Sequence, residues 1–225
     1  MPSSKETRHH ERDLLIGEIV AEVRDTSNYT GRTALHATTL DALRRVDRAD
    51  FVDDDNTPRA YINSPLGIGY GQTISQPYIV ALMTDLLDLD ADSRVLEVGT
   101  GSGYQAAVLA EIAAQVYTVE IVPELATSAR ETLTRLGYSN IHAKAGNGRL
   151  GWSEHGPYDA VIVTAAADDI PRALIDQLAP GGVLVIPLNT SRHAQSLKRI
   201  HKNDDGGIDE EDVLPVVFVP LTGDR

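Results

Sequence analysis

The stretch R-V-L-E-V-G-T-G-S-G-Y-Q-A-A, residues 94–107, decides the fold of this chain. It predicts a short buried strand over 95–98, a turn with glycine at every second position, and then the start of an alanine-rich helix. Glycine lets the backbone bend sharply and approach a ligand closely, and the start of a helix presents unpaired N–H groups. This order of elements is typical of a site for a nucleotide-like cofactor.

The spacing of the glycines indicates which cofactor. The dinucleotide-binding pattern G-x-G-x-x-G needs a third glycine where this chain has Tyr104. The pattern present is acidic-x-G-x-G-x-G, from Glu97 to Gly103, which is typical of S-adenosylmethionine-dependent methyltransferases. We expect Glu120, at the end of the next strand (116–120), to accept hydrogen bonds from two ribose hydroxyls, because it lies about 20 residues after the turn. The alternative is a purely structural glycine turn beside an exposed glutamate.

Composition limits the class of protein. The chain has 225 residues, 42% of them hydrophobic and 5% aromatic, which suits one domain with an aliphatic interior. It has no cysteine and its seven histidines are scattered, so we predict no metal site. No apolar run reaches the ~18 residues of a membrane span, and residues 1–10 lack the apolar segment of a signal peptide, so we expect a cytoplasmic protein without a membrane partner.

The charge of the chain bears on its partners. A formal net charge of −13 argues against nucleic-acid binding, because Lys and Arg carry most of that affinity. The acidity is either a solubility feature or a sign of a salt-rich environment.

Strands and helices alternate through the middle of the chain, and two further strands, 196–201 and 216–221, flank the polar turn 203–207. The pattern predicts a doubly wound, mostly parallel seven-stranded sheet with an antiparallel C-terminal hairpin and a ligand site at the carboxyl ends of the strands. The remaining predicted strands lie at 95–98, 116–120, 140–145, 159–165 and 183–188, and the helices at 103–114, 123–136 and 171–178.

Two helices are expected near the N-terminus. Apolar residues at helical spacing predict one over 11–23, and T-T-L-D at Thr38–Asp41 resembles a capping box that opens the second. We expect residues 38–225 to form a single methyltransferase domain and residues 1–37 a helical extension, to which the sequence assigns no role.

A second glycine-rich stretch, S-P-L-G-I-G-Y-G-Q-T-I-S-Q-P-Y, covers residues 64–78. We expect an irregular loop that ends at Ser75 as the N-cap of a helix with Pro77 in its first turn. Such a long loop is costly to order, so we expect it to serve a ligand. Ser75 is either a helix cap or a substrate contact, and the two roles are compatible.

Together, the two glycine-rich stretches resemble those of the protein-L-isoaspartate O-methyltransferase family of repair enzymes. The resemblance covers residues 38–222 and includes D-A-V-I-V-T-A-A-A, L-x-P-G-G and the terminal V-P-L-T. The glycine turn alone indicates only a methyltransferase, whereas the Q-T-I-S-x-P element is far more specific to this family. The resemblance implies a class I, Rossmann-like methyltransferase fold.

The resemblance also implies roles for individual residues. Ser75 matches the active-site serine, which contacts the isoaspartyl carboxylate, with Ile74 and Val219 as further substrate contacts. Asn147 stands where the family usually has Asp, and because Asn still offers a carbonyl oxygen we expect weaker cofactor binding rather than none. The cofactor-binding residues implied are Gln72, Thr73, Ile74, Glu97, Gly99, Thr100, Gly101, Ser102, Gly103, Glu120, Ile121, Asn147, Gly148 and Thr222.

The implied activity is transfer of a methyl group from S-adenosylmethionine to the free carboxylate of L-isoaspartyl residues in damaged proteins, by a monomeric enzyme. A carboxylate with a reference pKa of ~3.9 is already ionised at neutral pH, so Ser75 is expected to orient it rather than move a proton. Two alternatives remain. One is a methyltransferase of the same fold for a normal aspartate or RNA, and the other is a non-catalytic, cofactor-binding adaptor.

Overall fold

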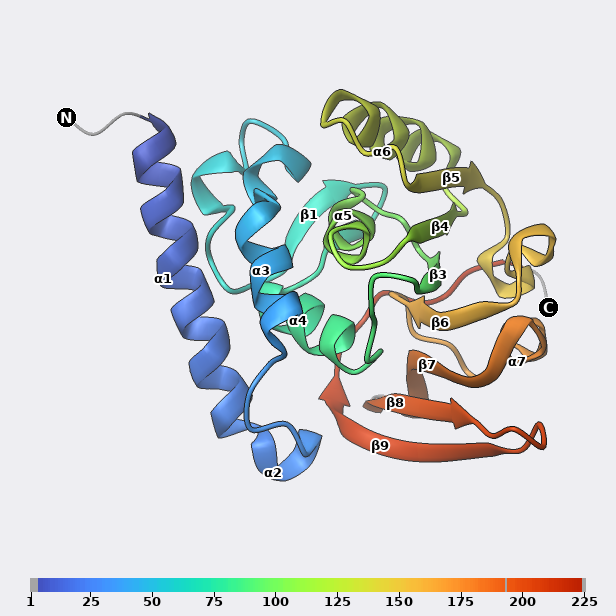
Figure 1. Ribbon diagram of the computed structural model, residues 1–225. Coiled ribbons are helices and arrows are strands. Elements are labelled where there is room, and N and C mark those ends of the chain that lie inside the picture. Colours follow the sequence, from blue (N-terminus) through green and yellow to red (C-terminus); the bar gives the residue numbers. More distant parts are fainter. Residues whose placement is uncertain (1–3, 193, 224–225) are drawn as a thin grey trace.

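A seven-stranded sheet forms the centre of the computed structural model, which describes residues 4–192 and 194–223. Its strands are β3 (Arg94–Val98), β4 (Gln115–Glu120), β5 (Ile141–Ala145), β6 (Tyr158–Val163), β7 (Leu178–Ser191), β8 (Ala194–Lys202) and β9 (Ile208–Val216). They lie in the order β5-β4-β3-β6-β7-β8-β9 (Figure 1). Neighbours from β5 to β7 are parallel, and β8 and β9 are antiparallel, which confirms the predicted fold class.

Both faces of the sheet are buried, because successive residues of a strand point to opposite faces. Val95 faces a core built with α4 (Pro77–Asp85), α5 (Tyr104–Ala110) and α6 (Pro123–Arg135), whereas Leu96 and Val98 face a second core built with α7 (Arg172–Gln177). The helices therefore lie on both sides of the parallel strands, as a doubly wound sheet requires.

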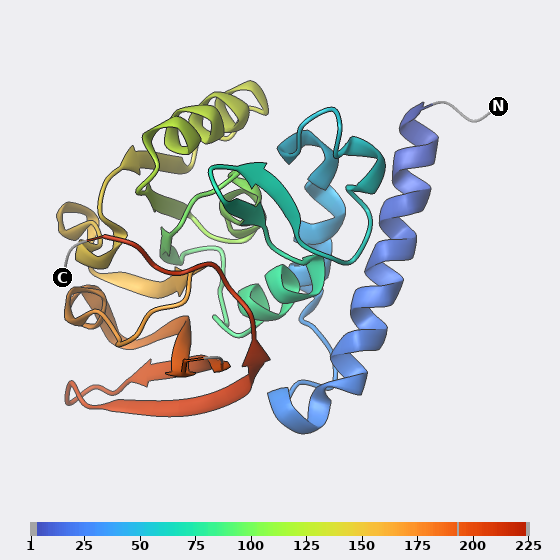
Figure 2. The same cartoon turned by 180° about the vertical axis from the view of Figure 1, so that it is seen from behind.

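Three helices precede the sheet: α1 (Ser4–Asp25), α2 (Ser27–Thr30) and α3 (Ala37–Arg45). Figure 2 shows α1 on the outside of the molecule, alongside α3 and α4. It is longer than predicted, and its apolar residues Leu15, Ile16, Ile19 and Val23 are buried in the same core as α4 and α5. Four short 3₁₀ helices complete the fold: η1 (Arg48–Phe51), η2 (Thr57–Arg59), η3 (Gly148–Leu150) and η4 (Ser153–His155).

The predicted capping box at Thr38–Asp41 is wrong. Helix α3 begins after His36 and has no side-chain cap. Thr39 instead donates its hydroxyl to Asp85 Oδ1 at 3.0 Å, and the backbone N–H of His36 donates to the same oxygen at 2.6 Å. A buried carboxylate needs donors, so this tertiary contact fixes the start of α3 at His36, ahead of the predicted box.

The stretch expected to be irregular contains an antiparallel hairpin, β1 (Leu66–Gly69) and β2 (Gln72–Ile74). Its tip holds Tyr70 and Gly71 at φ values of 53° and 72°, so a left-handed turn reverses the chain. Ser75 is not the N-cap of α4, because Gln76 occupies that position and makes no side-chain capping hydrogen bond.

The last predicted strand is misplaced. The acidic run after the turn belongs to β9, which ends at Val216, and residues 217–222 cross the carboxyl ends of the parallel strands, where Pro220 forms a bridge with Ala166 (Figure 2). An edge strand tolerates charge because one side is open to water. Asp212 of this strand also forms an ion pair with Lys198 of β8, at 2.9 Å between Nζ and Oδ2.

Candidate functional site

The strand order reverses between β3 and β6, and an open α/β sheet binds ligands at such a point. Val98 lies opposite Val119 on one side and Val163 on the other. The residues that follow these strands, Gly99 and Thr164 among them, therefore meet at one edge of the sheet. A cavity lies there, which we call the strand-end cavity. Of the site residues predicted from the sequence, those that line it are Gln72, Thr73, Gly99, Gly101, Glu120, Ile121, Gly148, Val219 and Thr222.

The glycine turn forms one wall of this cavity. Gly99 and Gly101 adopt φ values of 99° and 54°, which side chains rarely allow. A Cβ atom on Gly99 would overlap Thr164 Oγ1, which donates a hydrogen bond to the Gly99 carbonyl at 2.7 Å. The turn is thus pinned to the end of β6 with no room for a side chain, and its bare backbone faces the cavity.

Glu120 supplies the carboxylate of the strand-end cavity. Its Oε2 accepts the N–H of Gly101 at 2.8 Å, and its Oε1 accepts the N–H of Val122 at 3.0 Å. The residue is only 5% exposed. Because a carboxylate has about four acceptor sites, these two bonds fix its orientation and leave capacity for ligand hydroxyls.

Two predicted site residues, Glu97 and Thr100, lie beneath the turn and do not line the cavity. Glu97 is 0% exposed, and its Oε2 accepts the hydroxyl of Thr118 at 2.5 Å. Burial raises the pKa of Glu97 to about 8, because desolvation outweighs the opposing effect of the Thr118 hydrogen bond. Thr100 Oγ1 lies 2.5 Å from the same Thr118 hydroxyl. Both side chains can therefore support the turn but not contact a ligand there.

Four other residues that were predicted to bind the cofactor also lie outside the lining of the strand-end cavity. Gly103 is the N-cap of α5, Ser102 directly precedes it, and Ile74 is buried in the core. Asn147 caps η3, since its Oδ1 accepts the N–H of Arg149 at 3.0 Å. Its carbonyl oxygen therefore has a local role at the border of the cavity.

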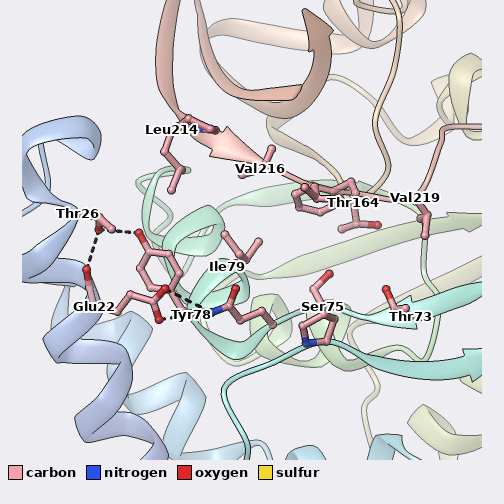
Figure 3. A pocket seen from close by; sticks show the side chains of 15 residues that line it. Glu22, Thr26, Thr73, Ser75, Tyr78, Ile79, Thr164, Leu214, Val216 and Val219 are labelled. Carbon is pink, nitrogen blue, oxygen red and sulfur yellow. Dashed lines mark hydrogen bonds between the residues drawn. The ribbon is translucent and has the colours of Figure 1, made fainter. Parts of the chain in front are cut away.

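A second and larger cavity, which we call the outer cavity, adjoins the first and measures about 450 Å³. Ser75 lines it, and Figure 3 shows the hydroxyls of Ser75 and Thr73 on the same side of it. Thr73, Thr164 and Val219 line both cavities. The two cavities therefore meet at a shared wall that includes the C-terminal segment.

The loop that carries Ser75 is held by a buried arginine. Arg48 Nη2 donates to the carbonyls of Ser75 at 3.1 Å and Ser64 at 3.0 Å, while Nη1 donates to the carbonyl of Ala60 at 2.7 Å. Arg48 is 1% exposed, and burial lowers its pKa to about 10. One guanidinium thus fixes three loop segments through a fork of donors that only arginine has.

Sequence reasoning missed several residues of the site. Thr164 could have been predicted, because it directly follows a strand whose carboxyl end lies at the site. Arg48 and the outer-cavity residues Glu22 and Thr26 carry no local signal, since only the packing of distant segments brings them there.

The chemistry of the donors fits S-adenosylmethionine. The strand-end cavity combines a carboxylate for ribose hydroxyls with glycine backbone that a ligand can approach closely, and a Cβ atom on Gly148 would overlap Val98. In the described part of the chain, no group of three or more His, Cys, Asp or Glu side chains could hold a metal ion. No helix there is long and apolar enough to span a membrane.

The relatives found by comparison with known sequences all carry the same family description. A family model described as protein-L-isoaspartate(D-aspartate) O-methyltransferase matches residues 26–225. A Polaromonas protein named protein-L-isoaspartate O-methyltransferase 2 is 53% identical over 211 residues, which cover 94% of this chain and 100% of the relative. A Syntrophobacter fumaroxidans protein of the same name is 50% identical over 212 residues, 94% of this chain and 86% of the relative.

Solved structures agree with the sequence relatives. A structure described as a protein-L-isoaspartate O-methyltransferase has a TM-score of 0.83 at 26% identity, covering 94% of this chain and 66% of that chain. A Plasmodium falciparum protein described as a beta-aspartate methyltransferase, in complex with S-adenosyl-L-homocysteine, has a TM-score of 0.73 at 26% identity, covering 91% and 97%.

Proposed function

Because this chain belongs to the protein-L-isoaspartate(D-aspartate) O-methyltransferase family, we propose that its two cavities hold the two reactants of that reaction. The chain is an S-adenosylmethionine-dependent protein carboxyl methyltransferase that acts on the isoaspartyl residues of damaged proteins. In our proposal the strand-end cavity binds the cofactor, and the outer cavity binds the isoaspartyl residue at Ser75.

One observation carries this assignment: Thr73, Thr164 and Val219 line both cavities. Methyl transfer requires the acceptor oxygen to attack the methyl carbon in line with the carbon–sulfur bond that breaks, so the two reactants must meet where the two cavities join. Holding two reactants in such a geometry supplies roughly 7–11 kcal/mol of a barrier.

The residues around the strand-end cavity would bind and orient the cofactor. Glu120 would accept the ribose hydroxyls, and the backbone at Gly99 and Gly101 would lie against the ligand. Ile121 and Gly148 would flank the adenine side of the cavity, with Thr222 above it. S-adenosylmethionine, when bound, supplies a methyl group on a positively charged sulfur.

The residues around the outer cavity would orient the acceptor and exclude water. The isoaspartyl carboxylate is ionised at neutral pH, so no general base is needed. Ser75 would donate a hydrogen bond to one carboxylate oxygen and leave the other free to react. Arg48 would keep Ser75 in place through its backbone carbonyl. The Val219 carbonyl already accepts the N–H of Ala166 at 2.8 Å, which holds the C-terminal segment across the site.

The partners of the enzyme follow from this proposal. Its substrates would be isoaspartyl-containing proteins and peptides. A single methyltransferase domain over 38–225, a monomeric and cytoplasmic state, and the lack of nucleic-acid and membrane partners stay predictions.

A labelling experiment tests the choice of acceptor. The purified protein would be given S-adenosylmethionine with a labelled methyl group together with an isoaspartyl peptide, its L-aspartyl twin or RNA. We expect label in the isoaspartyl peptide alone. Label in only the normal peptide or RNA would replace our proposal with another acceptor, and cofactor binding without transfer would indicate an adaptor.

Replacing Ser75 tests the assignment of the outer cavity. In Ser75→Ala we expect kcat to fall about fivefold, because an orienting hydrogen bond contributes on the order of 1 kcal/mol, and cofactor affinity to stay unchanged. Ser139→Ala, an exposed serine at the amino end of β5, is the matched control. Unchanged kcat in Ser75→Ala would remove the proposed role.

A further inference from the structure

A carboxylate lies in the outer cavity away from Ser75. Figure 3 shows Glu22 of α1, Thr26 directly after this helix and Tyr78 on one side of the cavity, and Ser75 with Thr73 on the other. Glu22 thus comes from the N-terminal helix, to which neither the sequence nor the methyl-transfer reaction gives a part.

Neutral amides hold this carboxylate in place. Asn63 Nδ2 donates to Glu22 Oε2 at 2.7 Å, and Gln76 Nε2 lies 3.4 Å from both carboxylate oxygens. Asn63 is itself oriented, because its Oδ1 accepts the backbone N–H of Tyr78 at 3.0 Å. The Thr26 hydroxyl donates to the Glu22 backbone carbonyl at 2.8 Å. Glu22 is therefore fixed before any ligand arrives.

The charge of Glu22 is not balanced within the part of the chain that the structure describes. None of the ion pairs found there includes it. Both of its side-chain donors are uncharged amides. A half-buried carboxylate in this state gains more from a cation than a solvated one would, because nearby protein reduces the screening by water.

The wall near Glu22 is apolar. Ile79, Leu214 and Val216 line the cavity together with the ring of Tyr78. An apolar wall with a single fixed carboxylate matches the side chain of lysine or arginine, whose aliphatic stem packs on hydrocarbon while its charged head seeks an anion. An acidic side chain would meet like charge in the same place.

We infer that Glu22 and the apolar wall beside it form a subsite for a lysine or arginine side chain of the client protein, close in sequence to the isoaspartyl residue. The inference rests on the proposed function, since it places the isoaspartyl residue at Ser75. It gives α1 a role in substrate selection: Glu22 recognises the neighbour of the damaged residue and takes no part in methyl transfer.

A peptide series tests the subsite. In a set of isoaspartyl peptides, one position at a time would carry lysine, norleucine or glutamate. The positions varied would be the two residues before the isoaspartyl residue and the two after it. At one or more positions we expect lysine to lower KM about fivefold relative to norleucine and glutamate to raise it, with kcat little changed. The preference should weaken as salt is added.

Variants assign the preference to Glu22. Glu22→Gln should abolish the lysine advantage and Glu22→Lys should reverse it in favour of glutamate, whereas Glu11→Gln, which removes the same charge from an exposed position of α1, should keep the wild-type pattern. Cofactor affinity and thermal unfolding, measured for each variant, confirm that it is folded.

Two outcomes would overturn the subsite: no lysine preference in the wild-type enzyme at any position, or the same preference in Glu22→Gln. The first can be measured on the wild-type protein alone, so the inference is testable even if the variants do not fold. Failure of the wild-type enzyme to methylate the norleucine peptides would instead count against the proposed function.

Discussion

The two cavities differ in how the chain builds them. Many residues of the strand-end cavity lie at the carboxyl ends of β3, β4 and β6 or directly after them, so neighbouring strands of one sheet bring them together. The outer cavity is made of α1, the segment after β2, α4 and residues 214–219, which lie far apart in sequence. The first depends on backbone geometry and the second on the packing of covering elements.

This difference predicts where the molecule tolerates change. A site formed by the backbone tolerates few substitutions, because a change of side-chain rotamer cannot relieve the strain of a positive φ or make room for an added Cβ atom. A site built from side chains on separate elements can change one contact at a time. We therefore expect the largest loss of activity at the glycine turn, a smaller one at the support of Ser75, and the smallest at the buried carboxylate beneath the turn.

Gly99→Ala should have the largest effect. At φ 99° an alanine is strained by about 1–3 kcal/mol, and its Cβ would overlap Thr164 Oγ1. We expect cofactor affinity to fall at least about tenfold and the free energy of unfolding to fall by about 2–4 kcal/mol. Calorimetric titration with S-adenosylmethionine and urea unfolding would measure the two losses.

The same substitution at Gly67 is the control. Gly67 lies in β1, its φ is not left-handed, and a Cβ atom there would meet nothing within 4 Å. Gly67→Ala should leave cofactor binding unchanged. Equal effects at both glycines would mean that the glycine turn is no more demanding than the hairpin, and the contrast between the cavities would fail.

The sequence predicted the strand-end cavity better than the outer cavity, and the reason is physical. A buried strand followed by a glycine turn or an acidic residue is a local pattern, and parallel pairing then places Gly99, Glu120 and Gly148 at one edge. The boundaries of β3, β4 and α6 came out within a few residues for the same reason. The fold class follows from these local signals, whereas the family resemblance also needs the Q-T-I-S-x-P element of residues 72–77.

What the sequence did not predict depends on distant contacts. In the sequence, nothing distinguishes Arg48 from a surface arginine. Only the folded chain brings three carbonyls from other segments to its guanidinium. The N-cap position of α3 is His36 rather than Thr38, and its backbone N–H donates to Asp85, which lies 49 positions away. Glu97 belongs to the cofactor motif by pattern, yet it lies opposite Thr118, inside the sheet, and is fully buried. Glu120 points to the same face of the sheet but lies two residues further along β4, at the strand end, so it reaches the cavity.

Arg48→Lys should have an intermediate effect. A lysine ammonium cannot reach the three carbonyls that the two ends of the guanidinium bind, so at least one buried carbonyl loses its partner. We expect kcat for an isoaspartyl peptide to fall several-fold and stability by about 1–3 kcal/mol, while cofactor affinity stays close to wild type.

Arg59→Lys, an exposed arginine in the adjacent η2, controls for the chemical change itself and should behave as wild type. Steady-state kinetics with titration of the cofactor separates the two cavities. If Arg48→Lys weakened cofactor binding as much as it lowered kcat, the two cavities would not be independent, and Arg48 would not act through Ser75 alone.

Glu97→Gln should have the smallest effect on activity, because burial raises the pKa of Glu97 to about 8 and the wild-type side chain is already neutral near pH 7.

The same pKa makes stability depend on pH. Between the ordinary value of 4.5 and about 8, the folded state holds a proton that the unfolded state has lost. Stability from this group is therefore full below the lower value and declines by about 1.4 kcal/mol per pH unit as pH rises through the window. Glutamine has no such proton, so urea unfolding from pH 5 to 8.5 should show a shallower decline in the variant. Parallel pH profiles in the two proteins would mean that Glu97 is ionised when folded, with a charge directly beneath the cofactor cavity.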